Sequence, residues 1–254
     1  MNGKNQGYKM KKVLVFDFYA PLGHFRMPYT TTSPLTFPIP SKTSIYGLVG
    51  AIIGLDKNDY LNYFQDETTK IAISVNKKIN KITIAQNLIN TKNVTMFARM
   101  DSRKQAPRTQ IRIEFLKNIS YRIYINFETE ELHSRLKSML SFHKTKYSIS
   151  MGLSECLANY NYIGEFDLIK VKDNNNFIEL NSILPINLLE NNSQIKLLEC
   201  NKKFLRVHLP LEMKPDRELI KSGDFIVEES AKTIFTSIES YFRIEELEQN
   251  IILF

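Results

Sequence analysis

The sequence contains no tryptophan and only two cysteines, Cys156 and Cys200. The spacing of these cysteines matches no zinc motif, and no HExxH, P-loop or glycine-rich dinucleotide motif is present. The longest apolar run, residues 47–55, is far shorter than the roughly 20 residues that cross a bilayer. The first ten residues are polar and lack the apolar core of a signal peptide. These absences predict a cytoplasmic protein with no metal or other cofactor.

Positive charge is distributed unevenly along the 254 residues, whose net charge is +7. Residues 224–254 hold seven acidic and two basic side chains, which is a local charge of −5 and leaves +12 on the preceding part. This asymmetry predicts a polyanionic partner for the N-terminal part and a different contact at the C-terminal end. An ordinary basic protein with an acidic C-terminal segment would show the same charges.

Hydrophobic periodicity predicts strands and helices in the order β-α-β-β-α-β. Apolar residues at helical spacing follow Ser41 and Thr129, which predicts one helix after each. The predicted strands of this unit are residues 11–19, 70–75, 120–127 and 162–171. The order is that of a ferredoxin-like domain, a topology shared by RRM domains, which carry RNA on their sheet.

An insertion and an extension complete the expected organisation. Residues 76–119 are far longer than an ordinary connection of about 4–6 residues, and they contain two strand-like runs, KITIAQNLI and QIRIEFL, around a polar tip. Residues 173–254 consist mostly of short strand-like runs separated by turn residues. The prediction is an α+β chain: a ferredoxin-like (RRM-like) domain at 10–172, an inserted β-hairpin at 76–119, and a β-rich C-terminal extension at 173–254.

The tip of the insertion is strongly basic. Residues 99–112 contain five cations against Asp101 alone, and Thr109 and Gln110 add uncharged hydrogen-bonding groups. Cations on a protruding hairpin can follow the phosphates of a nucleic acid. The candidate binding residues in this segment are Arg99, Arg103, Lys104, Arg108, Gln110 and Arg112. A solvated loop that charge keeps soluble is the alternative.

Two further segments combine cations with stacking or hydrogen-bonding groups. The N-terminus of a helix offers free N–H groups to a phosphate, and glycine allows close approach of the backbone. The candidate binding residues are His24, Arg26, Tyr29, Ser41, Lys42 and Thr43 around the start of the first helix, and His143, Lys144, Lys146 and Gly152 after the second. A plain helix cap at Ser41 and solvated cations elsewhere explain the same residues equally well.

Three stretches of the chain are similar to one known family. They are VLVFDFYAPLGHFRMPYTTTSPLTFPIPSKTSIYGLVGAIIGL, RTQIRIEFLKNISYRIYI and KYSISMGLSECLANYNYIGEF. Over about residues 10–170 the chain resembles CRISPR-associated protein family 5 of the RAMP superfamily, in the style of its type I-B branch. The resemblance implies a subunit of the Cascade surveillance complex in antiviral defence. Its ferredoxin-like domain would hold the 5′ handle of the crRNA, and its hairpin, the thumb, would reach the neighbouring backbone subunit.

The resemblance also implies contact with the large subunit that inspects the PAM on target DNA. It leaves a catalytic alternative, because one branch of the family cuts precursor crRNA without a metal, using a base and a cation. Tyr46, His143 and Lys144 are the residues that could take these roles here. The nearest branch leaves the cut to a separate endonuclease, so we expect a non-catalytic subunit. The stiff, proline-rich loop beside the glycine-spaced helix is expected to shape a pocket for unpaired handle nucleotides.

Overall fold

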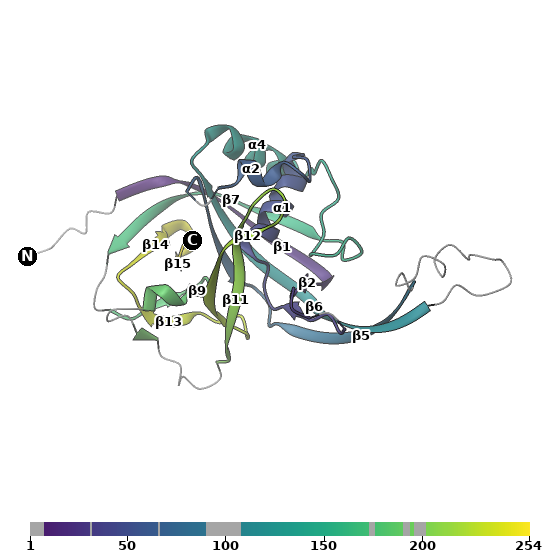
Figure 1. Cartoon of the computed structure of the whole chain (residues 1–254). Helices are drawn as coiled ribbons and strands as arrows, with labels where there is room; N and C mark the ends of the chain where they lie inside the picture. The colour runs from purple at the N-terminus through teal and green to yellow at the C-terminus, as the bar shows by residue number, and fades with distance from the viewer. Residues whose placement is uncertain are drawn as a thin grey trace, which may run out of the picture.

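The computed structural model describes residues 8–30, 32–65, 67–89, 108–172, 176–189, 194–195 and 202–254. The largest sheet has seven antiparallel strands in the order β15-β14-β7-β1-β6-β4, and β5 pairs with β6 beside this path. Its N-terminal strands are β1 (Tyr8–Gly23), β4 (Thr69–Val75), β5 (Asn80–Ile89), β6 (Arg108–Phe127) and β7 (Asn159–Lys172). The helices α1 (Lys42–Ile53), α2 (Tyr60–Tyr63) and α4 (Glu130–Ser141) lie together over one face of this sheet, as Figure 1 shows.

The central strand β1 lies between β6 and β7, and its alternation separates two apolar cores. Leu14, Phe16 and Phe18 point toward the helices and belong to the largest core cluster. Val13 and Val15 point to the opposite face and pack with residues of the C-terminal strands. Successive side chains of a strand point to opposite faces, so the continuous apolar run in β1 is explained by burial on both sides.

Helix α1 begins and ends where its local signals predict. The Ser44 N–H donates a 3.2 Å hydrogen bond to the Ser41 hydroxyl, which caps the helix, and Gly54 ends it in the left-handed region at φ +81°. Almost every side chain of α1 is buried, because the helix lies between the sheet and strand β11 of the C-terminal part.

Both long helices connect strands of the main sheet, at the places where the hydrophobic periodicity predicts helices. α1 connects β1 to β4, α4 connects β6 to β7, and the four strands lie in the order β7-β1-β6-β4. The apolar residues Leu132, Leu136 and Leu140 of α4 are buried, as their helical spacing predicts. Among the described residues, no helix is both long and apolar enough to cross a bilayer.

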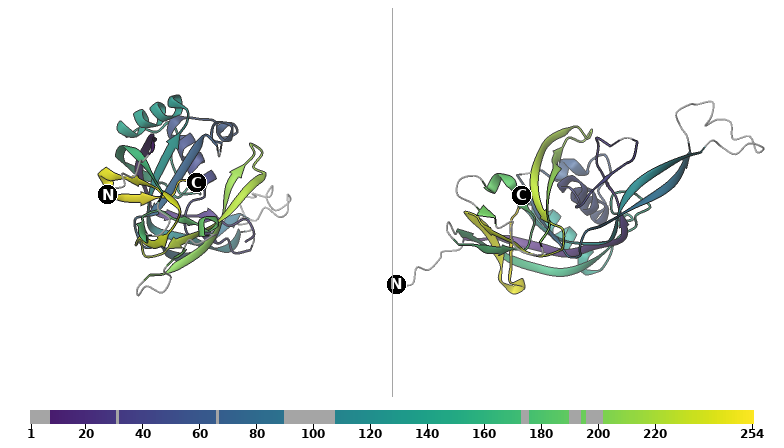
Figure 2. Two further views of the ribbon diagram at one scale, coloured as in Figure 1. Left: turned by 90° about the vertical axis from the view of Figure 1, so that its left-hand side faces the viewer. Right: turned by 90° about the horizontal axis from the view of Figure 1, so that it is seen from below.

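The predicted insertion forms a long hairpin of β5 and β6 that extends away from the body of the molecule (Figure 1; right-hand view of Figure 2). One detail of the prediction is wrong. The runs 110–116 and 120–127 belong to a single 20-residue strand, which passes through Asn118 at φ 51° instead of ending there. The strand continues because its outer half pairs with β5 and its inner half pairs with β1 and β4.

The C-terminal part is β-rich, as predicted, and it contributes to several sheets. β14 pairs with β7, so the C-terminal strands continue the main sheet, while the hairpin of β11 and β12 packs against α1 (Figure 1). Division of the chain at residue 173 stays a prediction. The elements are β8 (Ile178–Leu180), β9 (Leu184–Pro185), η1 (Ile186–Leu189), β10 (Gln194–Ile195), β11 (Phe204–Met213), β12 (Leu219–Glu228), β13 (Ile234–Ser237), β14 (Ser240–Ile244), η2 (Glu245–Leu247) and β15 (Gln249–Ile251). The short strands β2 (Phe25–Arg26) and β3 (Thr36–Phe37) pair with each other in the opening loop.

Candidate nucleic-acid interface

Two adjoining hollows form a groove along α1, which we call the α1 groove. The outer hollow has a volume of about 510 Å³, and the inner hollow has a volume of about 310 Å³. Both are lined by Gly47, Ala51, Tyr60 and Arg217, so they are continuous. The outer hollow is otherwise lined mainly by Gly50, Leu55, Asp56, Lys57 and Tyr147, and the inner one includes Thr43, Ser44, Ser148, Ser150 and Gly152.

The glycines of α1 explain how the groove remains open. A Cβ atom at Gly50 would lie 3.2 Å from the Tyr60 Cβ, and one at Gly47 would lie 3.7 Å from the Tyr60 hydroxyl. The close neighbour expected from the glycine spacing is therefore Tyr60 of α2. Because the helix has no side chains at these two positions, its backbone forms part of the floor of the groove.

The segment after α4 forms one wall of the α1 groove. The Lys146 N–H donates to the Ile52 carbonyl, and the Tyr147 N–H donates to the Ala51 carbonyl, both at 3.0 Å. These bonds hold the segment along the last turns of α1 and place Tyr147, which is 48% exposed, at the rim of the outer hollow. Lys144 and Lys146 are both exposed. Of the candidate residues from the sequence, the structure thus brings Thr43, Gly152 and these cations to one region.

Two candidate residues are internal to the fold. His24 is 2% exposed, and its Nδ1 donates a 2.7 Å hydrogen bond to the Glu114 carbonyl. Lys42 is 1% exposed, and its ammonium donates a 2.9 Å bond to the Phe254 carbonyl while lying 5.9 Å from the ring centroids of Tyr46 and Phe254. In this structure neither side chain presents its ring or charge to the surface. Burial of Lys42 also corrects the alternative that it is a solvated charge.

Of the other candidates around the opening loop, one caps helix α1 and two are exposed on the surface. Ser41 is 5% exposed and bonds to the Thr43 and Ser44 hydroxyls besides capping α1. Arg26 is exposed on β2, and Tyr29 is 71% exposed, with its hydroxyl donating to the sulfur of Met27. The surface residues can meet a ligand, whereas the Ser41 hydroxyl already serves the helix.

The backbone conformation of Gly152 is required by the protein itself. Its φ is +86°, and a Cβ atom there would lie only 1.9 Å from the His24 carbonyl oxygen. The His24 N–H in turn donates to the carbonyl of Met151 at 2.9 Å. The sequence suggested that a nucleic acid approaches this glycine closely, but the backbone that does so is the opening loop.

The β5–β6 hairpin presents a polar row along β6. Arg108, Gln110 and Arg112 are all exposed, and because they alternate along a strand they share one face of the hairpin. Glu114 follows on this face and forms an ion pair of 2.9 Å with Lys81. The other three candidates of the hairpin, Arg99, Arg103 and Lys104, lie outside the described residues.

The three residues of the catalytic alternative do not come together. Tyr46 is 1% exposed, its hydroxyl donates to the Thr69 carbonyl of β4 at 3.3 Å, and its ring stacks on Phe64. The His143 ring lies against that of Tyr160 of β7, with ring centroids 4.6 Å apart and a tilt of 35°, and Lys144 follows it in the chain. Tyr46 is thus held against β4 and His143 against β7, and β1 and β6 lie between these two strands in the sheet.

Sequence reasoning missed three residues that line the α1 groove: Tyr60, Tyr147 and Arg217. Arg217 lies in the turn between β11 and β12, 170 positions after Gly47, and no local signal links the two. Burial raises the pKa of Tyr60, and the positive charge of Arg217 opposes that rise, which shows that the two side chains are electrostatic neighbours. Tyr147 directly follows the candidate Lys146 and could have been found from that position.

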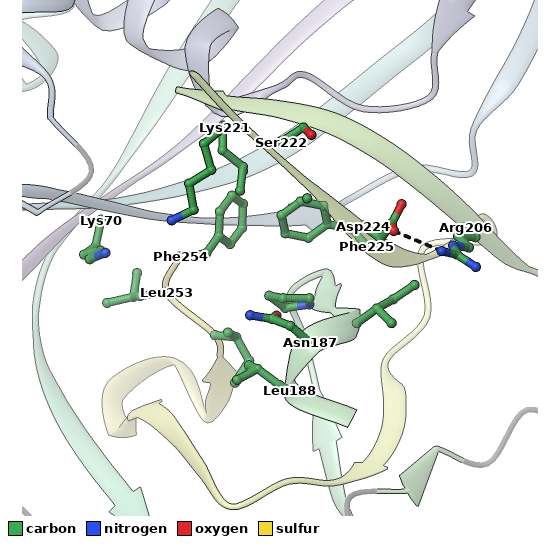
Figure 3. A pocket seen from close by; sticks show the side chains of 15 residues that line it. Lys70, Asn187, Leu188, Arg206, Lys221, Ser222, Asp224, Phe225, Leu253 and Phe254 are labelled. Carbon is green, nitrogen blue, oxygen red and sulfur yellow. Dashed lines mark hydrogen bonds and ion pairs between the residues drawn. The ribbon is translucent and has the colours of Figure 1, made fainter. Parts of the chain in front are cut away.

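A separate hollow of about 530 Å³ lies between β12, the 185–188 segment and residues 252–254 (Figure 3). Lys70, Lys221 and Arg206 reach its lining, and Arg206 forms an ion pair of 2.9 Å with Asp224. None of the sequence candidates lines it. Among the described residues, no group of three His, Cys, Asp or Glu side chains could hold a metal ion.

Comparison with known proteins identifies the family. The family model described as CRISPR-associated protein (Cas_Cas5) matches residues 13–190, well over half of the chain. The chain belongs to this family. The family assignment made from the sequence is thereby confirmed, while the type I-B subtype stays a prediction. No curated protein matches the chain in sequence.

Solved structures of CRISPR proteins are similar to this chain in fold. A CRISPR protein from Archaeoglobus fulgidus has a TM-score of 0.52 and 12% identity, and the alignment covers 96% of this chain and 99% of that one. At that identity the likeness shows the fold alone. A chain of a CRISPR RNA-guided surveillance complex has a TM-score of 0.48 and 8% identity, over 88% and 91% of the two chains. A chain of a Type III-B Cmr-beta structure bound to cognate target RNA and AMPPnP has a TM-score of 0.44 and 11% identity, over 89% and 86%.

Proposed function

We propose that this Cas5-family chain is a non-catalytic subunit of a Cascade-type CRISPR surveillance complex, and that it binds the 5′ handle of the crRNA. In this proposal the four strands β7-β1-β6-β4 with α1 and α4 are a ferredoxin-like domain of the RAMP type. The β5–β6 hairpin is its thumb and reaches the neighbouring backbone subunit. The large PAM-sensing subunit, with target DNA near the PAM, is the other expected neighbour.

The projecting β5–β6 hairpin carries the proposal. The outer half of β6 and its partner β5 leave the body of the protein with mostly exposed side chains, so the length of this hairpin is explained by a partner. Arg108 and Arg112 expose two cations on one face of it, with the amide of Gln110 between them. Such a row suits the phosphates and sugars of a single strand. Membership of the Cas5 family supports RNA as that partner.

Binding to RNA tests the proposal directly. The repeat RNA encoded beside the gene is cut to its 5′-handle segment, and its affinity for the full chain is measured by fluorescence anisotropy between about 50 and 200 mM salt. We expect handle RNA to bind more tightly than a scrambled RNA of the same length, with affinity falling as salt rises. No binding at low salt would show that the chain is a protein-only scaffold. Equal affinity for both RNAs would show that it binds RNA without sequence specificity.

The catalytic alternative requires a separate assay. Full-length repeat RNA is incubated with the protein in EDTA, and we expect it to remain intact, because the Tyr46 hydroxyl is buried against Thr69 and lies away from His143. Cleavage at one repeat position that disappears in the double variant His143→Ala with Lys144→Ala would establish endoribonuclease activity instead.

A further inference from the structure

The two halves of the α1 groove differ in chemistry. The outer half is apolar and flat-sided, with Gly47, Gly50 and Ala51 as its floor and the rings of Tyr60 and Tyr147 along it. The inner half has a mixed lining: the hydroxyls of Ser148 and Ser150 line it with those of Thr43 and Ser44, which also bond to Ser41, and apolar side chains such as Phe25, Ile149 and Met213 lie beside them. An apolar slot beside a row of hydroxyls matches a nucleotide, since a base offers a flat π-face and a ribose offers hydrogen-bonding oxygens. The volumes are within the usual range of ligand sites, about 300–1,000 Å³.

Arg217 is shared by the two halves of the α1 groove. It lines both hollows and stands in the turn of the β11–β12 hairpin, which lies against α1 (Figure 1). The turn is held by its backbone: the Arg217 N–H donates to the Lys214 carbonyl at 2.8 Å, and the Lys214 N–H donates to the Glu218 carbonyl at 2.9 Å. Within the described part of the chain, the Arg217 guanidinium makes no hydrogen bond and has no carboxylate partner.

The backbone of Arg217 is unusual for its residue type. Its φ is +70°, in the left-handed region that favours glycine, and the chain carries an arginine there instead. A non-glycine residue in this region costs about 1–3 kcal/mol unless surrounding structure imposes it, and such residues gather at functional sites. This cost supports a role for the arginine side chain, since glycine would suit the backbone better but has no guanidinium.

Charge favours a nucleic acid over an apolar peptide as the occupant. Lys57 and Arg217 line the outer hollow, and Lys144 and Lys146 are exposed on the segment that forms its wall, whereas Asp56 is the acidic residue of that lining. A guanidinium can stack on a base and contact a phosphate at the same time. A protein side chain would use the apolar half but would leave the cations without a role.

We infer that the α1 groove binds two consecutive unpaired ribonucleotides, with one base stacked in the outer half beneath Arg217 and the next ribose facing the hydroxyls of the inner half. The inference rests on the proposed function, because it takes crRNA as the ligand. It adds a recognition residue outside the part matched by the family model, which ends at residue 190. Recognition by this hairpin would therefore depend on this chain's own C-terminal sequence.

The test measures affinity and stacking on the full-length chain. Handle RNAs carrying 2-aminopurine at successive positions are titrated with wild-type protein, Arg217→Ala and Lys214→Ala. The last is a matched control, because it removes one cation from the same turn, where Lys214 forms an ion pair with Glu218 instead of lining the groove. We expect Arg217→Ala to weaken binding by roughly five- to 150-fold, the range that stacking of one base supplies, and Lys214→Ala to change it by less than about twofold.

The 2-aminopurine signal should be quenched at one handle position in wild type and restored there in Arg217→Ala. Arg217→Gly separates folding from binding, since glycine suits the positive φ: it should melt no lower than wild type and yet bind RNA as weakly as Arg217→Ala. A handle with 2′-deoxy sugars at that position and the next should bind several-fold more weakly than the ribose form.

The outcomes distinguish this inference from the function beneath it. If wild type binds handle RNA and Arg217→Ala binds it equally, the groove is not the nucleotide site, while handle binding stands. If the Arg217 variants keep RNA affinity but fail to join purified Cascade subunits, the occupant is a protein and the inference is overturned. If wild type does not bind handle RNA under any condition, the proposed function itself fails.

Discussion

The Lys42 ammonium, at the start of α1, donates a 2.9 Å hydrogen bond to the carbonyl oxygen of Phe254, 212 positions later in the chain. The bond joins the first helix of the N-terminal unit to the segment that follows β15. Phe254 also forms backbone hydrogen bonds in both directions with Ile71 of β4, at 3.1 and 2.9 Å. Phe254 therefore ties the start of α1 and strand β4 together at one point beside the main sheet.

Replacing Lys42 by methionine should lower stability while leaving RNA affinity unchanged. Methionine keeps much of the apolar stem but removes the hydrogen bond from the ammonium to the Phe254 carbonyl, and a hydrogen bond with a charged partner contributes about 1.5–3 kcal/mol. Urea unfolding gives the change in free energy, and anisotropy at a temperature where both proteins are folded gives the affinity. Lys78→Met, at an exposed lysine, should change neither quantity. A variant that is as stable as wild type but binds RNA more weakly would show that Lys42 contributes to RNA binding.

Replacing Gly152 by alanine should strongly destabilise the protein. The new Cβ would overlap the His24 carbonyl oxygen at 1.9 Å, and φ +86° disfavours any side chain, so a cost of about 2–4 kcal/mol is expected. The measurement is the shift of the urea midpoint. Gly47→Ala is the control within the same groove. Its Cβ would lie 3.7 Å from the nearest atom, the Tyr60 hydroxyl oxygen, which is an ordinary contact, and loss of a helical glycine should stabilise α1 by up to about 1 kcal/mol. Equal stability of the two variants would contradict this explanation.

Glu165 should make stability depend on acidity. Burial alone raises the pKa of this carboxyl, but hydrogen bonds from His133, Lys137 and Lys12 outweigh it and lower the pKa to about 2. A carboxyl whose pKa is lower in the folded state contributes stability above its unfolded pKa, near 4.5, and loses that contribution as pH falls toward 2. Urea midpoints measured between pH 6 and about 2.5 should therefore decline over this interval.

The variant Glu165→Gln separates this residue from general acid unfolding. It should be less stable than wild type near neutral pH and should show a shallower decline as pH falls, because the titrating group is gone. Glu246→Gln, at an exposed acid in η2, should keep the decline of wild type. If Glu165→Gln and wild type lose stability in parallel, other carboxyls dominate the acid response.

The double variant Arg108→Ala with Arg112→Ala should weaken handle binding without affecting folding. Both residues are exposed on β6, and exposed charges seldom change stability by more than about 0.5 kcal/mol. If each contacts one phosphate of a single strand, the slope of log affinity against log salt should become shallower by about 1.4. The double variant Arg135→Ala with Arg243→Ala removes the same charge from exposed sites off the hairpin and should leave the slope unchanged. Equal slopes for both variants would mean that the effect is one of net charge.

The helices and strands of the N-terminal unit could be predicted from the sequence alone. The spacing of apolar residues predicted α1 and α4, the serine before α1 predicted its cap, and the apolar run at residues 11–19 predicted the strand β1. Helices and strands arise from hydrogen bonds and side-chain periods within a few residues, so a sequence window contains the relevant information. The family was also evident from local stretches of sequence and is confirmed over residues 13–190.

Whether an individual candidate residue is buried or exposed depends on contacts with distant parts of the chain, which no short stretch of sequence contains. Lys42 and His24 were candidates because of their chemistry, but Phe254 and Glu114 hold them inside the fold. Arg217 had no signal, yet the β11–β12 hairpin places it over the glycines of α1. Whether a side chain is buried is decided by segments that meet only after the chain has folded, and each such meeting joins residues 90 to about 210 positions apart. The sequence by itself therefore determined the elements and the family, and tertiary packing decided which charged side chains are buried and which are exposed.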